Sequence, residues 1–139
     1  MDINLLGETT SIDHVAIAVT SIDEFIKSFH LHSHLNNMYR ETLSSEALHV
    51  AFLPEPYRLE LIEPMSETSS VSKFIQKNGS GKIHHIAYKV KNITETLIKL
   101  RNASIHLIDE KERLGARGKK IAFIHPKSCG GILIELCSE

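Results

Sequence analysis

The chain contains two segments in which bulky apolar residues alternate with small or polar ones. Residues Ile12–Val19 read IDHVAIAV, and residues Ile83–Val90 read IHHIAYKV. Period-two alternation is typical of a half-buried β-strand. In each strand the bulky side chains share one face, and the other face carries alanine together with His14 or His85. We expect the bulky face to pack beneath a helix and the face with the histidine to line a cavity.

Each predicted strand is followed by a helical pattern. Ser21 precedes Glu24 at the spacing of a capping box, and Asn92 precedes Glu95 in the same way. Three further strands are expected after each helix, near 37–43, 47–53 and 58–63 in the first copy and near 104–108, 119–125 and 131–137 in the second. A short helix is predicted at Ser69–Lys77, between the two copies.

The two copies follow one another in the same internal order. A shift of 71 residues aligns His14 with His85, and the motif VAFLP then falls on IAFIHP. The fold class expected is α+β, with two tandem βαβββ modules that form one open, eight-stranded, barrel-like sheet. The modules are expected at about 12–64 and about 83–137, joined by a linker at about 65–82, within a single domain of residues 1–139.

The composition is that of an ordinary globular chain of 139 residues, with 42% hydrophobic and 24% charged residues. A formal net charge of −1 argues against nucleic acid or a membrane surface as partner. No apolar run reaches the roughly 18–20 residues of a membrane span, and no secretory signal pattern is present. Cys129 and Cys137 have no zinc or redox spacing, so we expect free thiols in a cytoplasmic protein.

Two histidines and two glutamates stand at equivalent positions of the two modules: His14 and His85, and Glu60 and Glu135. Each glutamate lies in an apolar strand, where a carboxylate is costly to bury unless a cation meets it. Pairing of the modules about a pseudo-twofold axis brings the four side chains together. Imidazole and carboxylate suit one divalent ion, such as Co²⁺, Zn²⁺, Ni²⁺, Mn²⁺ or Fe²⁺. The sheet is therefore expected to surround a metal site with two positions open for substrate.

Five stretches of the sequence are the most characteristic: IDHVAIAV, VAFLP, LELIEP, SVSKFIQKNGSGKIHHIAYKV and LGARGKKIAFIHPKSCGGILIEL. On these motifs Ile12–Leu136 resembles the vicinal oxygen chelate (glyoxalase/bleomycin-resistance) superfamily, and within it the methylmalonyl-CoA epimerases. The resemblance implies metal ligands at His14, Glu60, His85 and Glu135, the four residues reached from the repeat. It also implies a homodimer and a small-molecule acyl-CoA, or a related thioester, as substrate.

The implied reaction is epimerisation at the carbon alpha to a thioester, in which a proton leaves one face and returns to the other. A divalent ion acts there as a Lewis acid for the enolate. The resemblance implies Glu135 as the catalytic base on one face. On the other face epimerases have a glutamate, and the matching residue here is His49. Its alternation with Ala47 and Ala51 directs it toward the cavity as an acid or base, although Glu46 stands nearby and a polar wall residue is the simpler alternative.

The loop GARGKK carries three cations, Arg117, Lys119 and Lys120. Its small residues allow backbone N–H groups to approach an anion, and the cations suit phosphates or a substrate carboxylate. Strand alternation allows at most one of the two lysines to face the cavity. Ser128, in the motif HPKSCGG, is a further candidate for substrate binding.

Two other functions fit the same sequence. The first is a glyoxalase I-like lyase or isomerase, or another superfamily enzyme of secondary metabolism, and the departure at His49 favours it. The second is a non-catalytic, resistance-type protein that binds a small molecule. The presence of all four candidate ligands argues against the second alternative.

Overall fold

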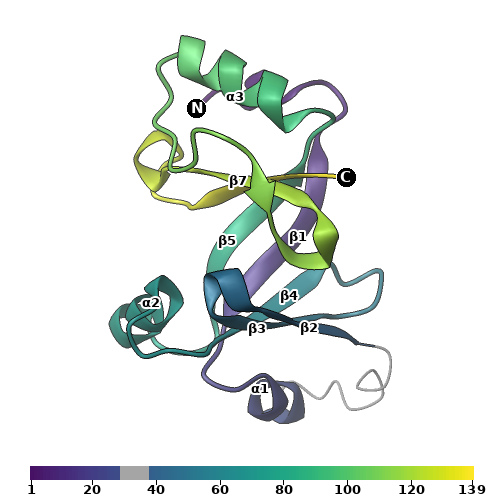
Figure 1. Ribbon diagram of the computed structural model, residues 1–139, viewed down its shortest axis with the longest axis vertical. Coiled ribbons are helices and arrows are strands. Elements are labelled where there is room, and N and C mark those ends of the chain that lie inside the picture. The colour runs from purple at the N-terminus through teal and green to yellow at the C-terminus, as the bar shows by residue number, and fades with distance from the viewer. Residues whose placement is uncertain (29–37) are drawn as a thin grey trace. The chain divides into compact units, whose positions relative to one another are not determined.

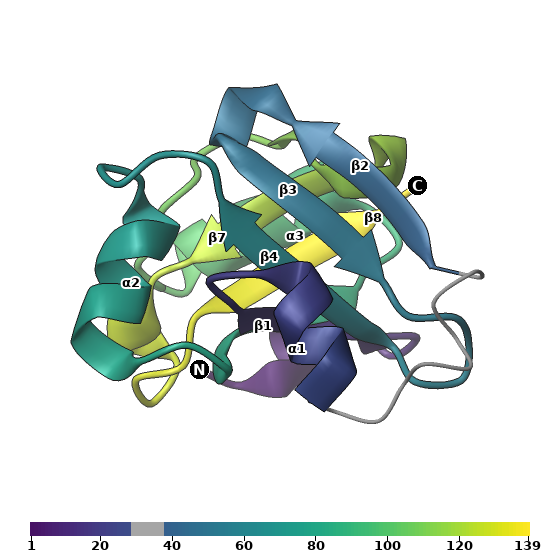
Figure 2. The ribbon, with the colours of Figure 1, turned by 90° about the horizontal axis from the view of Figure 1, so that it is seen from below.

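The computed structural model describes residues 1–28 and 38–139 (Figures 1 and 2). Its strands are β1 (Ser11–Ala18), β2 (Tyr39–Leu43), β3 (Leu48–Phe52), β4 (Leu59–Pro64), β5 (Lys82–Lys89), β6 (Arg113–Leu114), β7 (Lys120–Ile124) and β8 (Ile134–Ser138). Its helices are α1 (Ile22–Ser28), α2 (Ser70–Asn78) and α3 (Ile93–Asn102), with short 3-10 turns that include η1 (Ile3–Leu6), η4 (Ala116–Gly118) and η5 (Pro126–Ser128). The strands follow the order β2-β3-β4-β1-β5-β8-β7-β6 in one sheet. The α+β class, the repeated βαβββ order and the eight strands are therefore confirmed.

The chain forms two compact units. One unit consists of Val15–His84, and the other combines Met1–His14 with His85–Glu139. Both boundaries fall inside a strand, because β1 and β5 each contribute residues to both units.

The unit of residues 15–84 packs α1 against one face of its strands. β4 pairs with β3 in the antiparallel sense and with β1 in the parallel sense. Ile22 and Ile26 of α1 lie in one buried cluster with Leu61 of β4. Ser21 caps α1 as predicted, since its hydroxyl accepts a hydrogen bond from the Glu24 N–H at 3.2 Å. The face of β4 that carries Leu61 is thereby the helix-covered face.

The unit of residues 1–14 and 85–139 repeats this arrangement with α3. β8 pairs with β5 in the parallel sense and with β7 in the antiparallel sense. Leu97 and Leu100 of α3 are buried in one cluster with Ile134 and Leu136 of β8, and Leu6 of η1 joins them. The predicted cap holds here too, because Asn92 accepts from the Glu95 N–H at 3.1 Å. In this unit the face of β8 opposite Ile134 and Leu136 is free of the helix.

One predicted strand is misplaced. Instead of a strand near 104–108 the structure has a single bridge, Leu107 to Ile124, and the short strand β6 follows at Arg113–Leu114. The segment still makes main-chain hydrogen bonds, from the His125 N–H to His106 and from the Ile108 N–H to Phe123. The Asp109 N–H donates to the same Phe123 carbonyl, and the Asp109 carboxylate accepts the Phe123 N–H at 2.8 Å, so the pairing stops there. The backbone therefore leaves the ladder beside β7 and returns to it four residues later. For the predicted strand near 37–43, position 37 lies outside the described residues.

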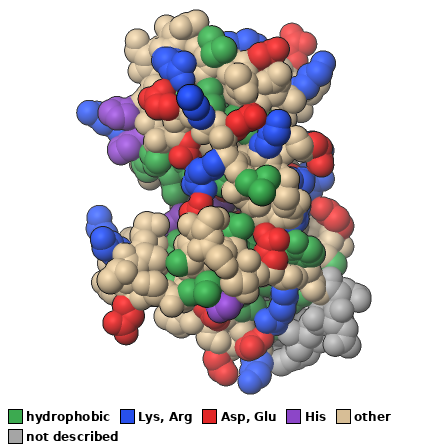
Figure 3. Space-filling model, in the orientation of Figure 1, with side chains coloured by type: hydrophobic (Ala, Val, Ile, Leu, Met, Phe, Trp, Pro, Cys, Tyr) green, Lys and Arg blue, Asp and Glu red, His purple; other side chains and the backbone are tan. Residues whose placement is uncertain are grey.

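Charged side chains of both signs are interspersed on the face drawn in Figure 3, in keeping with the formal net charge of −1. Among the helices of residues 1–28 and 38–139, none combines the length and the apolarity needed to cross a membrane.

Candidate metal centre

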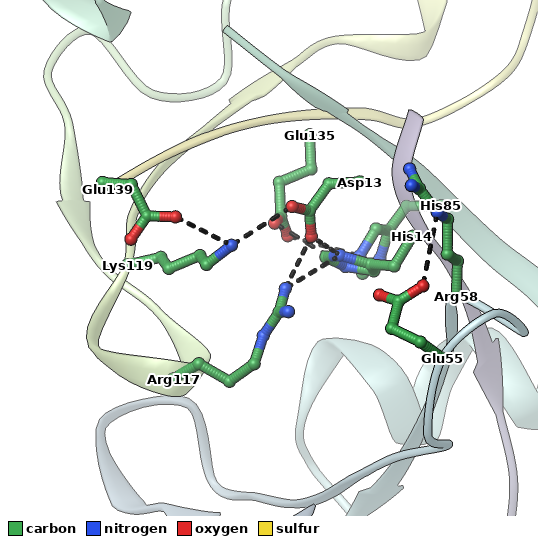
Figure 4. Close-up of polar contacts among 9 residues, drawn as sticks. All are labelled: Asp13, His14, Glu55, Arg58, His85, Arg117, Lys119, Glu135 and Glu139. Carbon is green, nitrogen blue, oxygen red and sulfur yellow. Dashed lines mark hydrogen bonds and ion pairs between the residues drawn. The ribbon is translucent and has the colours of Figure 1, made fainter. Parts of the chain in front are cut away.

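Three of the four predicted ligands meet within the unit of residues 1–14 and 85–139. His14 Nε2 lies 3.4 Å from His85 Nε2, and His85 Nε2 lies 3.3 Å from Glu135 Oε2. The other carboxylate oxygen, Glu135 Oε1, is 3.8 Å from His14 Nε2. All three residues are at most 6% exposed, and Figure 4 shows them turned toward one another.

Strand alternation and register bring these side chains together. Glu135 is the partner of Ala87 across the β5–β8 ladder, and His85 lies two residues before Ala87 on the same face of β5. Ile86 and Ile134, on the opposite face, pack in the core under α3. His85, and not its neighbour His84, therefore lies beside His14.

The adjacent histidine has a different environment. The His84 ring packs edge-on against Phe74 of α2, with ring centroids 4.9 Å apart. This contact lies wholly within the unit of residues 15–84. His84 is thus a packing residue, and it supplies a natural control for His85.

The convergent atoms fit a divalent metal ion. Two imidazole nitrogens and a carboxylate suit Zn²⁺ and neighbouring divalent metals. Ligand atoms that each lie about 2.1 Å from one ion are roughly 3–3.5 Å apart, close to the observed 3.3–3.8 Å. A buried carboxylate is costly unless a cation lies nearby. The donor set is therefore consistent with a divalent metal site.

The fourth predicted ligand, Glu60, belongs to the unit of residues 15–84. It is buried in β4, with 5% exposure, and is the register partner of Ala16 in β1. It points away from the α1-covered face, which carries Leu61. Its membership of the ligand set stays a proposal.

The expected orientation of His49 is wrong. Its register partners are Glu63 of β4 and Thr42 of β2, and Thr42 Oγ1 lies 3.1 Å from His49 Nδ1. Glu63 accepts the Ile22 N–H at 2.8 Å, which places this face against the start of α1. The alternation within β3 was interpreted correctly, but the face with His49 is opposite to the face with Glu60.

Glu41 is the ionisable residue that the sequence reasoning missed on the Glu60 face. Its partner in β3 is Val50, and Val50 in turn pairs with Ile62, two residues after Glu60. The Glu41 carboxylate is half-buried and accepts the Tyr39 hydroxyl at 2.7 Å. The signal for Glu41 was the same alternation, but only the hairpin register relates it to Glu60.

Asp13 forms a second layer around His14. Its carboxylate lies 2.7 Å from His14 Nδ1, and it also accepts hydrogen bonds from Arg117 and, at 3.2 Å, from Lys119 (Figure 4). Burial by itself raises the pKa of Asp13, but the hydrogen bonds from His14 and Arg117 and the charge of Arg117 outweigh it and hold this pKa far below its usual range. Asp13 is therefore a carboxylate at neutral pH.

The predicted substrate-binding residues divide into three groups by position. Arg117 and Lys119 are paired with Asp13, and Lys119 also lies 3.4 Å from Glu139. Lys120 is 54% exposed in its side chain and pairs with Glu112, on the other side of the strand from Lys119. Ser128 accepts the His106 N–H through its hydroxyl at 2.9 Å, so its role in the structure is to hold the η5 loop.

This fold and donor set define an α+β protein of tandem βαβββ modules with a candidate site for a divalent metal ion. The chain belongs to the Glyoxalase/Bleomycin resistance protein/Dioxygenase superfamily, whose pattern matches residues 13–123.

Known proteins with high similarity include one without assigned function and two epimerases. The chain is 40% identical over 127 residues to the uncharacterized protein YqjC of Bacillus subtilis (strain 168), covering 91% of this chain and 90% of that one. It is 34% identical to the crystal structure of methylmalonyl-CoA epimerase from Mycobacterium tuberculosis, with a TM-score of 0.80 and coverage of 91% and 86%. A variant of the Streptomyces coelicolor methylmalonyl-CoA epimerase, in complex with 2-nitronate-propionyl-CoA, is 28% identical, with a TM-score of 0.81 and coverage of 93% and 94%.

Proposed function

We propose that this protein is a metal-dependent epimerase of a 2-methyl-malonyl-type acyl-CoA thioester. The observation that carries the proposal is the convergence of His14, His85 and Glu135 at 3.3–3.8 Å in a buried site. The similarity to two methylmalonyl-CoA epimerases over more than nine-tenths of the chain supports the substrate class.

The ligands in this proposal are His14 and His85 through Nε2, and Glu135 and Glu60 through their carboxylates. A divalent ion held there supplies Lewis-acid polarisation of the thioester carbonyl and the neighbouring carboxylate oxygen. The burial of His14, His85 and Glu135, each at most 6% exposed, strengthens the electrostatic interactions among these three side chains. Co²⁺, Zn²⁺, Ni²⁺ and Mn²⁺ all accept this donor set.

The protein's own carboxylates move the proton. The Glu135 carboxylate takes the alpha proton from one face of the substrate, and the electron pair of the C–H bond moves toward the thioester carbonyl. A proton delivered from the opposite face then gives the other epimer, so no oxidant or co-reactant is consumed. We propose Glu41 as the acid on that second face, since it replaces His49 as the ionisable side chain on the face of Glu60.

The decisive experiment follows proton exchange. Purified protein loaded with Co²⁺ is incubated in D₂O with one epimer of methylmalonyl-CoA, and NMR follows deuterium at the alpha carbon and the ratio of epimers. Exchange and epimerisation are expected together, and Glu135→Gln should abolish both. Absence of exchange with Co²⁺, Zn²⁺, Ni²⁺ and Mn²⁺ alike would overturn the proposal.

A substrate comparison separates the main alternative. The hemithioacetal of methylglyoxal and glutathione is offered to the same metal-loaded protein. Turnover of this compound without exchange of methylmalonyl-CoA identifies a glyoxalase I-like activity.

We also propose that the protein is a homodimer and that it is cytoplasmic. Light scattering on the purified protein tests the proposed homodimer.

A further inference from the structure

The contact between Asp13 and His14 joins two neighbours in one strand. Adjacent residues of a strand point to opposite faces, so β geometry does not impose the 2.7 Å approach of Asp13 Oδ2 to His14 Nδ1. The Asp13 side chain is only 7% exposed and turns back toward the histidine ring. Something other than the strand must hold it there.

Two cations from the segment before β7 hold the Asp13 carboxylate. Arg117 donates to Oδ2, the same oxygen that meets His14, and Lys119 donates to Oδ1. Arg117 adopts a left-handed backbone conformation, with φ 59° and ψ 23°, which few non-glycine residues adopt. This conformation belongs to the turn that brings its guanidinium to Asp13.

The carboxylate determines which nitrogen of His14 carries the proton. An ionised carboxylate only accepts hydrogen bonds, and so the nitrogen that faces it must donate. His14 Nδ1 therefore bears the hydrogen, and the lone pair remains on Nε2. That is the atom that points at His85 Nε2 and Glu135.

Arg117 determines which nitrogen of His14 would carry the proton if the Asp13 carboxylate were removed. Its Nη2 lies 3.5 Å from His14 Nδ1 as well as beside Asp13. A guanidinium only donates. If the carboxylate is removed, Nδ1 faces a donor and becomes the acceptor, so a ring that carries one proton holds it on Nε2.

We propose that Asp13 is a positioning residue, held by Arg117 and Lys119, which fixes His14 as the Nδ1–H tautomer so that Nε2, directed at His85 and Glu135, is the atom that binds the divalent ion. This inference rests on the proposed metal-dependent function and deepens it. It assigns Arg117 and Lys119 to the support of a ligand, in place of the direct substrate contacts expected from the loop. Outer carboxylates of this kind typically change metal affinity by about 10- to 100-fold.

The test uses two measurements on metal-free and metal-titrated protein. Long-range ¹H–¹⁵N correlation spectra of the metal-free wild type should show His14 as the Nδ1–H tautomer, and Asp13→Ala should shift it toward Nε2–H. Competition with a chromophoric chelator should give a Co²⁺ affinity about 10- to 100-fold weaker for Asp13→Ala. Arg117→Gln, which leaves Asp13 held by Lys119, should weaken Co²⁺ binding by a smaller factor.

Glu112→Gln is the charge-matched control. It removes a carboxylate that pairs with Lys120 and touches none of the ligands, so both measurements should match those of the wild type. If Asp13→Ala does not fold, Asp13→Asn replaces it, because one amide oxygen cannot accept from His14, Arg117 and Lys119 together.

The possible failures are distinguishable. If the wild type binds no divalent ion, the proposed function and this inference both fall. If the wild type binds Co²⁺ but the Asp13 variant binds it equally well, only the inference falls. An Nε2–H tautomer in the metal-free wild type also overturns it, whatever the activity.

Discussion

The adjacent histidines of β5 allow one prediction in which ligand loss is separated from loss of stability. His85 is 4% exposed and touches His14, Glu135 and Phe123, whereas His84 packs on Phe74 in the other unit. We compare His85→Ala with His84→Ala. His84→Ala loses one ring contact and His85→Ala loses two. A ring contact is worth about 0.5–1.5 kcal/mol beyond the buried area, so both variants should melt several degrees lower without metal.

The metal-induced shift should differ between them. A ligand at 100 times its Kd stabilises the native state by about 2.7 kcal/mol. For a chain of this size 1 kcal/mol corresponds to about 3–5 °C in Tm, so the wild type should gain roughly 8–14 °C. If loss of His85 raises Kd 100-fold, the same Co²⁺ concentration adds only about 0.4 kcal/mol, or 1–2 °C.

Differential scanning fluorimetry of chelator-treated protein, with and without Co²⁺, measures this shift. His84→Ala should keep the full wild-type increment despite its lower starting Tm. The ligand assignment is refuted if His85→Ala retains the increment, or if His84→Ala loses it.

Three further predictions follow from single side chains. Glu41→Gln should lower epimerisation by about 10²–10⁴-fold, while His49→Ala, on the α1-covered face, should change it less than threefold or so; equal losses in an NMR epimerisation assay would contradict the face assignment. Leu100→Ala in the α3 core should lower the free energy of unfolding by about 2–5 kcal/mol in urea titrations, and a loss below about 1 kcal/mol would show that this core is not tightly packed. Burial raises the pKa of the Cys137 thiol to about 12, and the nearby carboxylates of Asp13 and Glu135 add to the effect. Because this folded-state pKa exceeds the ordinary thiol value of 9.0, the stabilising contribution of the thiol is complete below pH 9 and falls by up to about 1.4 kcal/mol for each pH unit above that. Above pH 9 the free energy of unfolding should therefore fall less steeply with pH in Cys137→Ala than in the wild type. Parallel curves for the two proteins would contradict the raised pKa of Cys137.

The repeat made most of the ligand set predictable. Period-two alternation selected His85 over His84, and the matching position in the last strand indicated Glu135 as its neighbour. The caps at Ser21 and Asn92 were equally predictable, because capping depends on residues three apart. These features are local, or are copied between the modules, so the order of residues is sufficient to find them.

The tertiary structure decided what depends on register and on loops. Alternation shows which residues of a strand share a face, but not which face meets the helix, and so His49 was assigned to the wrong side while Glu41 was missed. The strand expected near 104–108 is reduced to one bridge, and the pairing goes no further because the Asp109 side chain takes the Phe123 N–H.

The support of His14 was also beyond the sequence. Asp13 and His14 are neighbours in one strand, and strand geometry predicts that their side chains point to opposite faces. Arg117 reaches Asp13 from 104 residues away in the sequence, through a left-handed turn. By itself the sequence determined which residue types stand at equivalent positions of two modules, since duplication preserves them. Only the fold decided which nitrogen of His14 faces Asp13 and which faces Glu135, because that depends on a carboxylate and two cations brought together by long-range contacts.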